Sequence, residues 1–300
     1  MKIVRYTHRG NESFGVLKED SEIIDLLKLS KLQGRSVPSN IDGLISLGSD
    51  AESLLKELVD DLLNNRKEKV VLKQNTVHLK APVVNPPKII CLGLNYKDHV
   101  KEAGAVLPNE PIIFMKPRTA IIGPDDAVVK PRFVNELDYE VEMAAIIGKK
   151  GKNIPISEAK EFIFGYTVFN DISARDIQFK DKQWTRGKSF DTFAPIGPCI
   201  VTNEQLGDSA NLRLQTRVNG EIRQNSSTSL MLFNVYEVIY HLSRVMTLEP
   251  CDIIATGTPG GVAAFMKPER KFLKLGDTVE VEVEKIGILR NKIQEEKIIR

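Results

Sequence analysis

Two strand-like stretches, the first with alternating apolar and acidic residues and the second mostly apolar, organise the middle of the chain. The first is Leu137–Met143, with the sequence Leu-Asp-Tyr-Glu-Val-Glu-Met, and the second is Gly165–Asp171. Short runs rich in β-branched and aromatic residues, with turn residues between them, are typical of β-strands. Because residues two apart in a strand point to the same face, the pattern predicts that Glu140 and Glu142 project together.

Similar patterns predict a small β-rich module before this region. Residues 83–87 read Val-Val-Asn-Pro-Pro, a rigid and extended connector that favours a domain boundary. We therefore expect a small domain at residues 1–82 and a larger one at residues 83–300. The small domain should hold strands at Lys2–Tyr6, Ser13–Leu17, Ile23–Leu27 and Val70–Leu79, and a helix from about Ser49 to Asn65 with a leucine stripe from Leu54 to Leu63.

The larger domain is predicted to contain more strands than helices. The dipeptide Asn219-Gly220 between two strand-like runs is a strong hairpin signal. Other strands are expected at Lys88–Leu92, Ile112–Lys116 and Cys251–Ala255, an edge hairpin at Thr278–Lys285 and Ile288–Ile293, and helices ending at Gly104, near Ser157–Phe164 and at Leu230–Val245.

Alternation of acidic and apolar residues also fits a strand with one face in water. Val279–Glu284 repeats the alternation found at Glu140 and Glu142. We interpret its acidic residues, Glu280, Glu282 and Glu284, as a solvent-facing sheet surface. Spacing alone therefore leaves both interpretations open for Glu140 and Glu142.

Composition narrows the class of protein. The 300 residues carry 42 basic and 40 acidic side chains, a net charge of +2 that gives no electrostatic argument for binding nucleic acid or an anionic membrane. No run of 18 apolar residues predicts a membrane span, and Arg5, Arg9 and Glu12 interrupt any signal-like segment. The three cysteines are far apart and odd in number, which favours buried thiols in a reducing cytoplasm.

Three carboxylates are candidates for a metal site. Asp171 ends an apolar run where a strand should pass into a loop, so it could meet Glu140 and Glu142. Three converging carboxylates repel one another unless a cation joins them. All-oxygen ligands suit a hard divalent ion such as Mg²⁺ or Mn²⁺, with coordination positions left for a substrate.

A second candidate group lies in the helix expected before Gly104. His99 and Glu102 are three residues apart, so they share a helix face and can hydrogen-bond. A carboxylate beside an imidazole fixes its tautomer and makes it a better base. The alternative is an exposed surface pair.

Two further segments could add charge or polar groups to a site. Lys116 ends an apolar strand, either as a surface residue or as a cation aimed at a site. The exposed amides of Thr256–Gly261 could hold a carboxylate or phosphate, or the segment could be a plain glycine turn. Residues 172–190 read as polar loops that include the single tryptophan.

Several short segments follow one another in a fixed order along the chain. They are Gly93-Leu94-Asn95-Tyr96 with His99 and Glu102, then Glu140-Val141-Glu142, Asn170–Asp176 with Gln178, Lys188-Ser189-Phe190, and Thr256-Gly257-Thr258-Pro259. Taken in this order, they resemble the fumarylacetoacetate hydrolase family, and the resemblance covers roughly residues 88–293. The similarity is to short members: acylpyruvate hydrolases, oxaloacetate decarboxylases, and isomerases or decarboxylases of homoprotocatechuate breakdown.

The resemblance implies an α+β fold that is mainly β, a mixed β-roll catalytic domain after a small β-rich N-terminal domain, and a homodimer. It also implies site residues. Mg²⁺ or Mn²⁺ would be held by Glu140, Glu142 and Asp171; His99, Glu102 and Lys188 would be catalytic; and Lys116, Arg175, Gln178 and Thr258 would bind or support the substrate.

The expected function is metal-dependent hydrolysis of a carbon–carbon bond in a 2,4-dioxo acid, of the acylpyruvate or fumarylpyruvate type, through a pyruvate enolate. Alternatives are oxaloacetate decarboxylation and isomerisation or decarboxylation of 2-hydroxyhepta-2,4-diene-1,7-dioate. A non-catalytic alternative is a metal-binding assembly module. The partner would be a small 2-oxo acid, and the location cytoplasmic.

Overall fold

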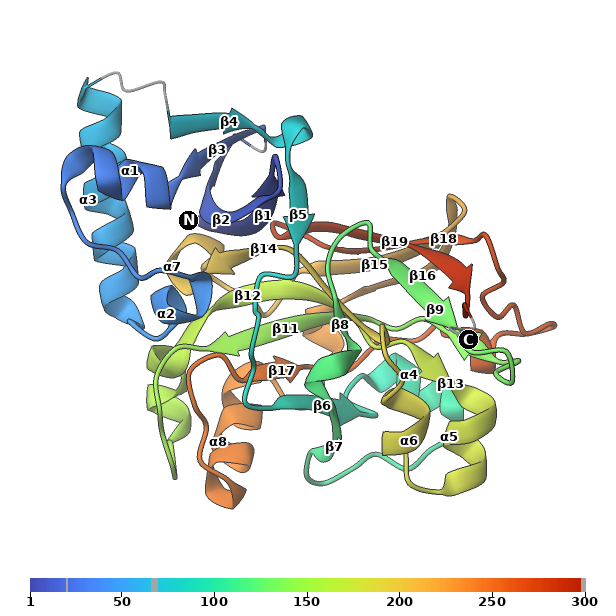
Figure 1. Ribbon diagram of the computed structural model, residues 1–300. Coiled ribbons are helices and arrows are strands. Elements are labelled where there is room, and N and C mark those ends of the chain that lie inside the picture. Colours follow the sequence, from blue (N-terminus) through green and yellow to red (C-terminus); the bar gives the residue numbers. More distant parts are fainter. Residues whose placement is uncertain (20, 66–69, 298–300) are drawn as a thin grey trace.

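The computed structural model describes residues 1–19, 21–65 and 70–297, and within them the strands form three sheets (Figure 1). The largest has the order β4-β3-β2-β1-β14-β12-β11-β17-β6-β7, with β5 on β1 and β8 on β14. Its strands are β1 Lys2–His8, β2 Asn11–Lys18, β3 Glu22–Asp25, β4 Val71–Lys73, β5 His78–Lys80, β6 Ile89–Gly93, β7 Ile112–Lys116, β8 Ile121–Ile122, β11 Val141–Ile147, β12 Ile163–Asn170, β14 Ala194–Thr202 and β17 Ile253–Ala255.

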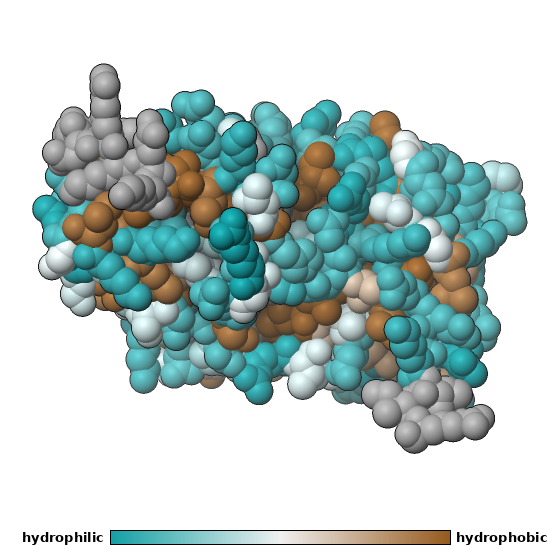
Figure 2. All heavy atoms as spheres, turned by 45° about the horizontal axis from the view of Figure 1, so that its top comes forward, coloured by the Kyte–Doolittle hydropathy of each residue, from teal (hydrophilic) through white to brown (hydrophobic). Residues whose placement is uncertain are grey.

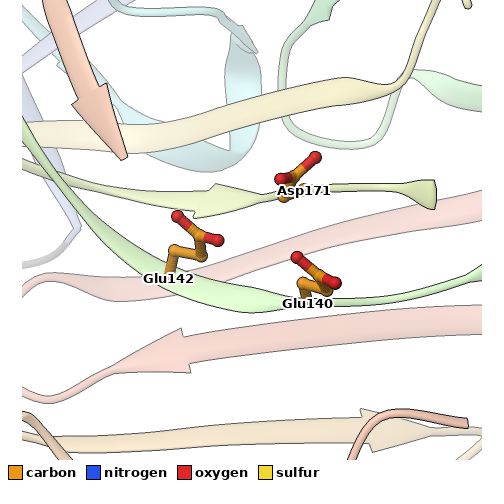
Figure 3. A group of neighbouring side chains, drawn as sticks. All are labelled: Glu140, Glu142 and Asp171. Carbon is orange, nitrogen blue, oxygen red and sulfur yellow. The ribbon is translucent and has the colours of Figure 1, made fainter. Parts of the chain in front are cut away.

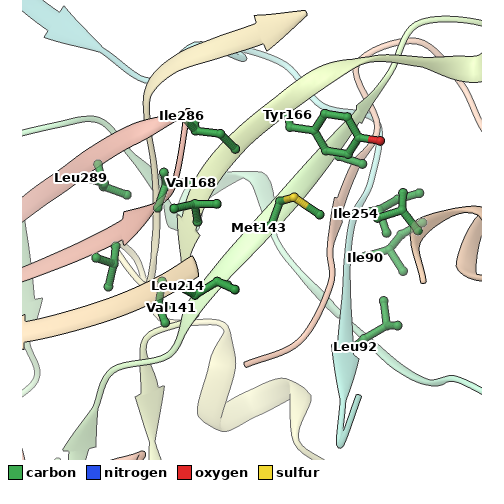
Figure 4. Packing of buried hydrophobic residues seen from close by; sticks show 14 of the residues in the cluster. Ile90, Leu92, Val141, Met143, Tyr166, Val168, Leu214, Ile254, Ile286 and Leu289 are labelled. Carbon is green, nitrogen blue, oxygen red and sulfur yellow. The ribbon is translucent and has the colours of Figure 1, made fainter. Parts of the chain in front are cut away.

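A second, five-stranded sheet of order β16-β15-β18-β19-β9 covers one face of the large sheet. Figure 4 shows Val141 of β11 and Val168 of β12 in one cluster with Leu214, Ile286 and Leu289, which come from the five-stranded sheet and its connections. Its strands are β9 Ala127–Lys130, β15 Arg213–Val218, β16 Glu221–Ser227, β18 Thr278–Val283 and β19 Gly287–Glu295, and the small third sheet pairs β10 Leu137–Asp138 with β13 Ser173–Ala174.

Both faces of the central strand β11 are buried. Val141 and Met143 belong to the core shared with the five-stranded sheet, whereas Ala144 and Ile146 belong to a second core on the opposite face. The period of two therefore places the side chains of Glu140 and Glu142 on the side of the second core.

The first three helices pack on the second core of the large sheet, where their buried leucine and isoleucine side chains lie. Helix α8 begins at a capping box that Asn234 and Glu237 form. The helices are α1 Leu26–Gln33, α2 Ile41–Ile45, α3 Ser49–Asn65, α4 Lys97–Ala103, α5 Arg175–Asp181, α6 Thr185–Lys188, α7 Asn203–Leu206 and α8 Val235–Val245, with 3-10 turns at η2 Gln74–Thr76, η3 Arg118–Ala120, η4 Ile156–Phe162, η5 Thr228–Leu230 and η6 Ala263–Phe265.

The α+β, mainly β fold class is confirmed. The N-terminal hairpin, the Asn219-Gly220 hairpin and helix α3 also lie where the sequence predicts them. Leu55, Leu58 and Leu62 of α3 are buried, while the side chain of Leu63 lies outside the described residues. The division at residue 82 stays a prediction, and the large sheet crosses it because β1 pairs with β14.

Several predicted elements end elsewhere, for local reasons. The strand predicted to reach Leu27 stops at Asp25, because the Asp25 carboxylate accepts from the Lys28 amide and starts α1. The strand predicted at Val70–Leu79 is interrupted by η2. The predicted helix at 230–245 begins at Val235, the one near 157–164 is the 3-10 turn η4, and the loops predicted at 172–190 contain α5 and α6.

On the face shown in Figure 2, apolar side chains lie between hydrophilic ones. Within the described residues, no helix has both the length and the apolar character needed to cross a membrane.

The C-terminal hairpin forms as predicted, because β18 pairs with β19, but its position at a sheet edge is wrong, since β18 also pairs with β15 and β19 with β9. Two of its acidic residues, Glu280 and Glu282, are accordingly less exposed than expected. The Glu282 side chain is 19% exposed and forms ion pairs with Arg213 and Arg217, and Glu280 pairs with Arg217. Glu284 is exposed, as predicted.

We expect Glu282→Gln to lower the free energy of unfolding by about 0.5–1 kcal/mol, because it removes charge from two ion pairs. Glu284→Gln, at the exposed end of the same segment, should change it by less than about 0.5 kcal/mol. Urea unfolding followed by circular dichroism measures both. Equal effects would show that burial of Glu282 does not matter.

Candidate active site

Three carboxylates meet where β11 and β12 lie side by side. Glu140 directly precedes β11 and Asp171 directly follows β12, and the Asp171 amide donates to the Glu140 carbonyl at 3.0 Å. Figure 3 shows Glu140 and Glu142 on one strand with Asp171 beside them on the next. One oxygen from each lies within 4.8 Å of the others, and all three residues are buried.

Glu142 has unmet bonding capacity. Its Oε2 accepts from the Gly257 amide at 2.9 Å, whereas its Oε1 is buried without a hydrogen-bond partner. Burial, together with the charges of Asp171 and Glu140, raises the pKa of Glu142 well above its usual value. A cation bound here would offset these costs, and an all-oxygen set of three carboxylates fits a hard divalent ion.

Lys188 lies against the same carboxylates. Its ammonium donates to Glu140 Oε2 at 2.8 Å and to Asp171 Oδ2 at 2.9 Å, and it sits 5.1 Å above the centre of the Phe114 ring. Burial opposes the charged form, but Asp171 and Glu140 outweigh it and raise the pKa of Lys188. Burial likewise opposes ionisation of Glu140, but Lys188 and Arg175 lower its pKa to about 2.

Lys116 lies behind Asp171 instead of facing the pocket. Its ammonium forms an ion pair with Asp171 Oδ1 at 2.6 Å and donates to the carbonyl oxygens of Ile172, Lys188 and Phe193. Burial outweighs the attraction of Asp171 and lowers the pKa of Lys116. Its donors are all committed, so this geometry supports positioning of Asp171 and does not support the expected contact with a substrate.

Arg175 and Gln178 come from the first turns of α5. The Arg175 guanidinium donates to Glu140 Oε1 at 2.5 Å, to Gln178 Oε1 at 2.9 Å and to Asp138 Oδ2 at 2.8 Å. Arg175 therefore fixes one oxygen of Glu140 and leaves the other to Lys188. Gln178 also lines the pocket.

The His99–Glu102 pair forms as predicted, and it is not a surface pair. Nδ1 of His99 lies 2.8 Å from Glu102 Oε1, and the other oxygen of Glu102 accepts from the Gly261 amide at 2.8 Å. The His99 side chain is only 8% exposed and lies on the wall of the pocket. Its ring centre is 5.8 Å from that of Phe265.

The glycine-rich segment after β17 forms hydrogen bonds to two carboxylates of the site. Two of its amides, those of Gly257 and Gly261, donate to Glu142 and Glu102 and so hold carboxylates of the chain itself. Thr258 lines the pocket, and its hydroxyl donates to the Val141 carbonyl at 3.0 Å and accepts from Gln224 at 2.8 Å.

The pocket encloses about 470 Å³, part of it open to solvent. A close approach shapes one wall: a Cβ added at Gly93 would lie 1.9 Å from the Trp184 ring. Gly93 belongs to a segment that the sequence analysis singled out, but Trp184 is distant from it in sequence, so no local pattern predicts their contact. The apolar lining, which sequence reasoning missed, is Leu92, Leu94, Phe114, Phe179, Trp184 and Phe265.

Known proteins resemble this chain over most of its length. The family described as "Fumarylacetoacetate (FAA) hydrolase C-terminal" matches residues 88–294. A mitochondrial oxaloacetate tautomerase of Xenopus laevis is 41% identical over 279 residues, 92% of this chain and 84% of that protein.

Solved structures agree with this match. Fumarylacetoacetate hydrolase from psychrophilic Exiguobacterium antarcticum has a TM-score of 0.83 and 36% identity, covering 99% of this chain and 100% of that one. Maleylpyruvate hydrolase from Sphingobium sp. SYK-6, in complex with manganese(II) and pyruvate, has a TM-score of 0.79 and 29% identity with the same coverage. The fold, the site and these similarities show that the chain belongs to the fumarylacetoacetate hydrolase family and is an enzyme.

Proposed function

We propose that this enzyme performs metal-dependent enolate chemistry on a short 2-oxo acid, and first of all interconverts the keto and enol forms of oxaloacetate. One observation carries the proposal: Glu140 of the buried carboxylate group, Lys188 and the oriented imidazole of His99 line the same pocket. The 41% identity to an oxaloacetate tautomerase supports this reaction over the hydrolysis that the sequence analysis placed first.

Glu140, Glu142 and Asp171 would hold Mg²⁺ or Mn²⁺. When bound, such an ion supplies positive charge that stabilises an enolate oxygen. Lys188 adds a second buried positive charge beside two of these carboxylates. Arg175 and Lys116 keep Glu140 and Asp171 in place, and Gln178 offers a polar group to the substrate. Thr258 also lines the pocket, but its hydroxyl hydrogen is committed to the Val141 carbonyl, so it would contact the substrate only as an acceptor or through its methyl group.

His99 is the proposed base. Glu102 binds Nδ1 of the imidazole, so Nε2 is the nitrogen available to the pocket. In the keto-to-enol direction, Nε2 takes a proton from C3 of oxaloacetate, and the electron pair of that C–H bond forms the C2–C3 double bond. The oxygen on C2 then receives a proton, and the reverse sequence restores the ketone.

Hydrolysis of an acylpyruvate is the second candidate, favoured by the His99–Glu102 pair and by the similarity to a maleylpyruvate hydrolase. His99 would take a proton from water as its oxygen bonds to C4. The C3–C4 bond then breaks, its electron pair forms a pyruvate enolate, and a proton completes pyruvate. Family membership leaves no support for the non-catalytic alternative. The homodimer and the cytoplasmic location stay predictions.

The first prediction concerns the metal. Turnover should disappear in chelator and return with Mg²⁺ or Mn²⁺, and Glu142→Ala or Asp171→Ala should abolish it while the circular dichroism spectrum stays that of a folded protein. Calorimetric titration with Mn²⁺ gives the binding constant directly. Full turnover in chelator, or in either variant, contradicts the metal assignment.

Metal affinity should also depend on pH. Because burial, Asp171 and Glu140 raise the pKa of Glu142, a proton competes with the cation for its carboxylate. The affinity for Mn²⁺ should therefore weaken as pH falls. Calorimetric titrations across the range from neutral to acid pH test this, and an affinity independent of pH would show that Glu142 does not exchange a proton for the ion.

A third prediction separates the reactions. His99→Ala should lower kcat for oxaloacetate tautomerisation, and for any acylpyruvate hydrolysis, by about 10²–10⁴-fold, because both need a base. Oxaloacetate decarboxylation should fall much less, because it needs mainly a stabilised enolate. Glu102→Gln should cause a milder loss of the same kind. Tautomerisation is followed by the loss of enol absorbance, and hydrolysis and decarboxylation by the release of pyruvate, all at saturating Mg²⁺.

The control for these variants is Lys101→Ala, an exposed residue of the same helix. Asp98 would be a poor control because its carboxylate accepts from the Ser226 hydroxyl at 2.7 Å. Equal losses in all three reactions would rule out a specific proton transfer by His99. Hydrolysis without tautomerisation would make the second candidate the function.

A further inference from the structure

Asp138 is a fully buried carboxylate that neither contacts the proposed metal nor lines the pocket. Its position is fixed by backbone amides. Oδ1 accepts from the amides of Tyr139 and Ala263, each at 2.9 Å, and Oδ2 accepts from the amide of Ala264 at 3.0 Å. A carboxylate held by three amides is an immobile negative charge.

That fixed charge is directed at Arg175. Oδ2 of Asp138 accepts from the Arg175 Nε at 2.8 Å, which leaves the two terminal nitrogens of the guanidinium for Glu140 and Gln178. A guanidinium is planar, so fixing its Nε edge also fixes the directions of its other donors. Asp138 thus determines where Arg175 presents its charge to the metal-binding wall.

The same residue connects this wall to the wall that carries the base. Ala263 and Ala264 begin the turn η6, which ends at Phe265, and the Phe265 ring packs on the His99 imidazole and lies 6.3 Å from the Phe179 ring.

We propose that Asp138 is a positioning residue for the reaction, acting through Arg175 on the orientation of Glu140. The proposal rests on the proposed metal-dependent function of the same pocket. An asparagine at this position keeps the shape of the side chain, but its amide group cannot accept the hydrogen bonds that one of the two oxygens now receives. Arg175 would then lose its fixed partner.

The test compares Asp138→Asn, Arg175→Lys and the double variant. Asp138→Asn should lower kcat by at least about 10-fold and weaken Mn²⁺ binding in calorimetry several-fold, with a smaller effect on KM. If Asp138 acts through Arg175, the double variant should be no worse than Arg175→Lys alone, within about twofold. Two independent roles would instead multiply their losses.

Asp252→Asn is the matched control. Asp252 is equally buried, pairs with Lys88 at 2.9 Å and accepts from the Glu249 amide at 2.8 Å, but it does not line the pocket. It should lower the thermal midpoint while kcat and Mn²⁺ affinity stay within about twofold of wild type. If Asp138→Asn changes only the stability, as the control is expected to do, the proposal is overturned. It is also overturned if the losses of the two single variants multiply in the double variant.

Hydrogen exchange in the metal-free protein separates failure of this proposal from failure of the proposed function. Asp138→Asn should speed amide exchange in peptides covering residues 175–178 and 261–265, whereas Asp252→Asn should not. If the wild type binds no Mn²⁺, the proposed function fails, and faster exchange at both segments still supports the positioning of Arg175. Unchanged exchange at residues 175–178 would overturn it.

Discussion

Charge compensation inside the protein is the constraint on which the rest of this structure depends. Three buried carboxylates within 4.8 Å of one another repel strongly unless cations lie beside them. Lys188, Lys116 and Arg175 provide that charge, each by direct contact with one or two of the acids. Removing one partner of such a group costs about 3–5 kcal/mol, because the remaining charge is buried without compensation. Glu140 and Asp171 are therefore coupled energetically to these three cations.

The segment after β17 forms hydrogen bonds both to the carboxylate group and to the His99–Glu102 pair. Gly257 donates to Glu142 and Gly261 donates to Glu102, so amides four residues apart hold a carboxylate of the proposed metal site and the partner of the proposed base. Both glycines have positive φ, +90° and +103°, which other residues rarely adopt. The backbone conformation of this segment is thus a condition for the distance between base and carboxylates.

Sequence reasoning found the site residues whose neighbours are local. Glu140 and Glu142 follow from the strand period, and His99 with Glu102 follows from helical spacing. Asp138 lies two and four residues before the two glutamates, so the strand period alone would place its side chain beside theirs. The break between β10 and β11 turns it instead toward Arg175. The position of Lys116 behind Asp171 and the contact of Trp184 with Gly93 depend on long-range packing, which no local pattern encodes.

The N-terminal residues also bear on the site through the large sheet. Strand β1 pairs with β14 through Lys2–Val201 and Ile3–Ile200, and β14 pairs with β12, the strand that leads to Asp171. Without residues 1–82, β14 would keep only the two-residue β8 on that side, and its backbone donors and acceptors would be open. An unprotected edge of this kind recruits strands from other molecules. The N-terminal part therefore covers an edge of the sheet that carries the carboxylates.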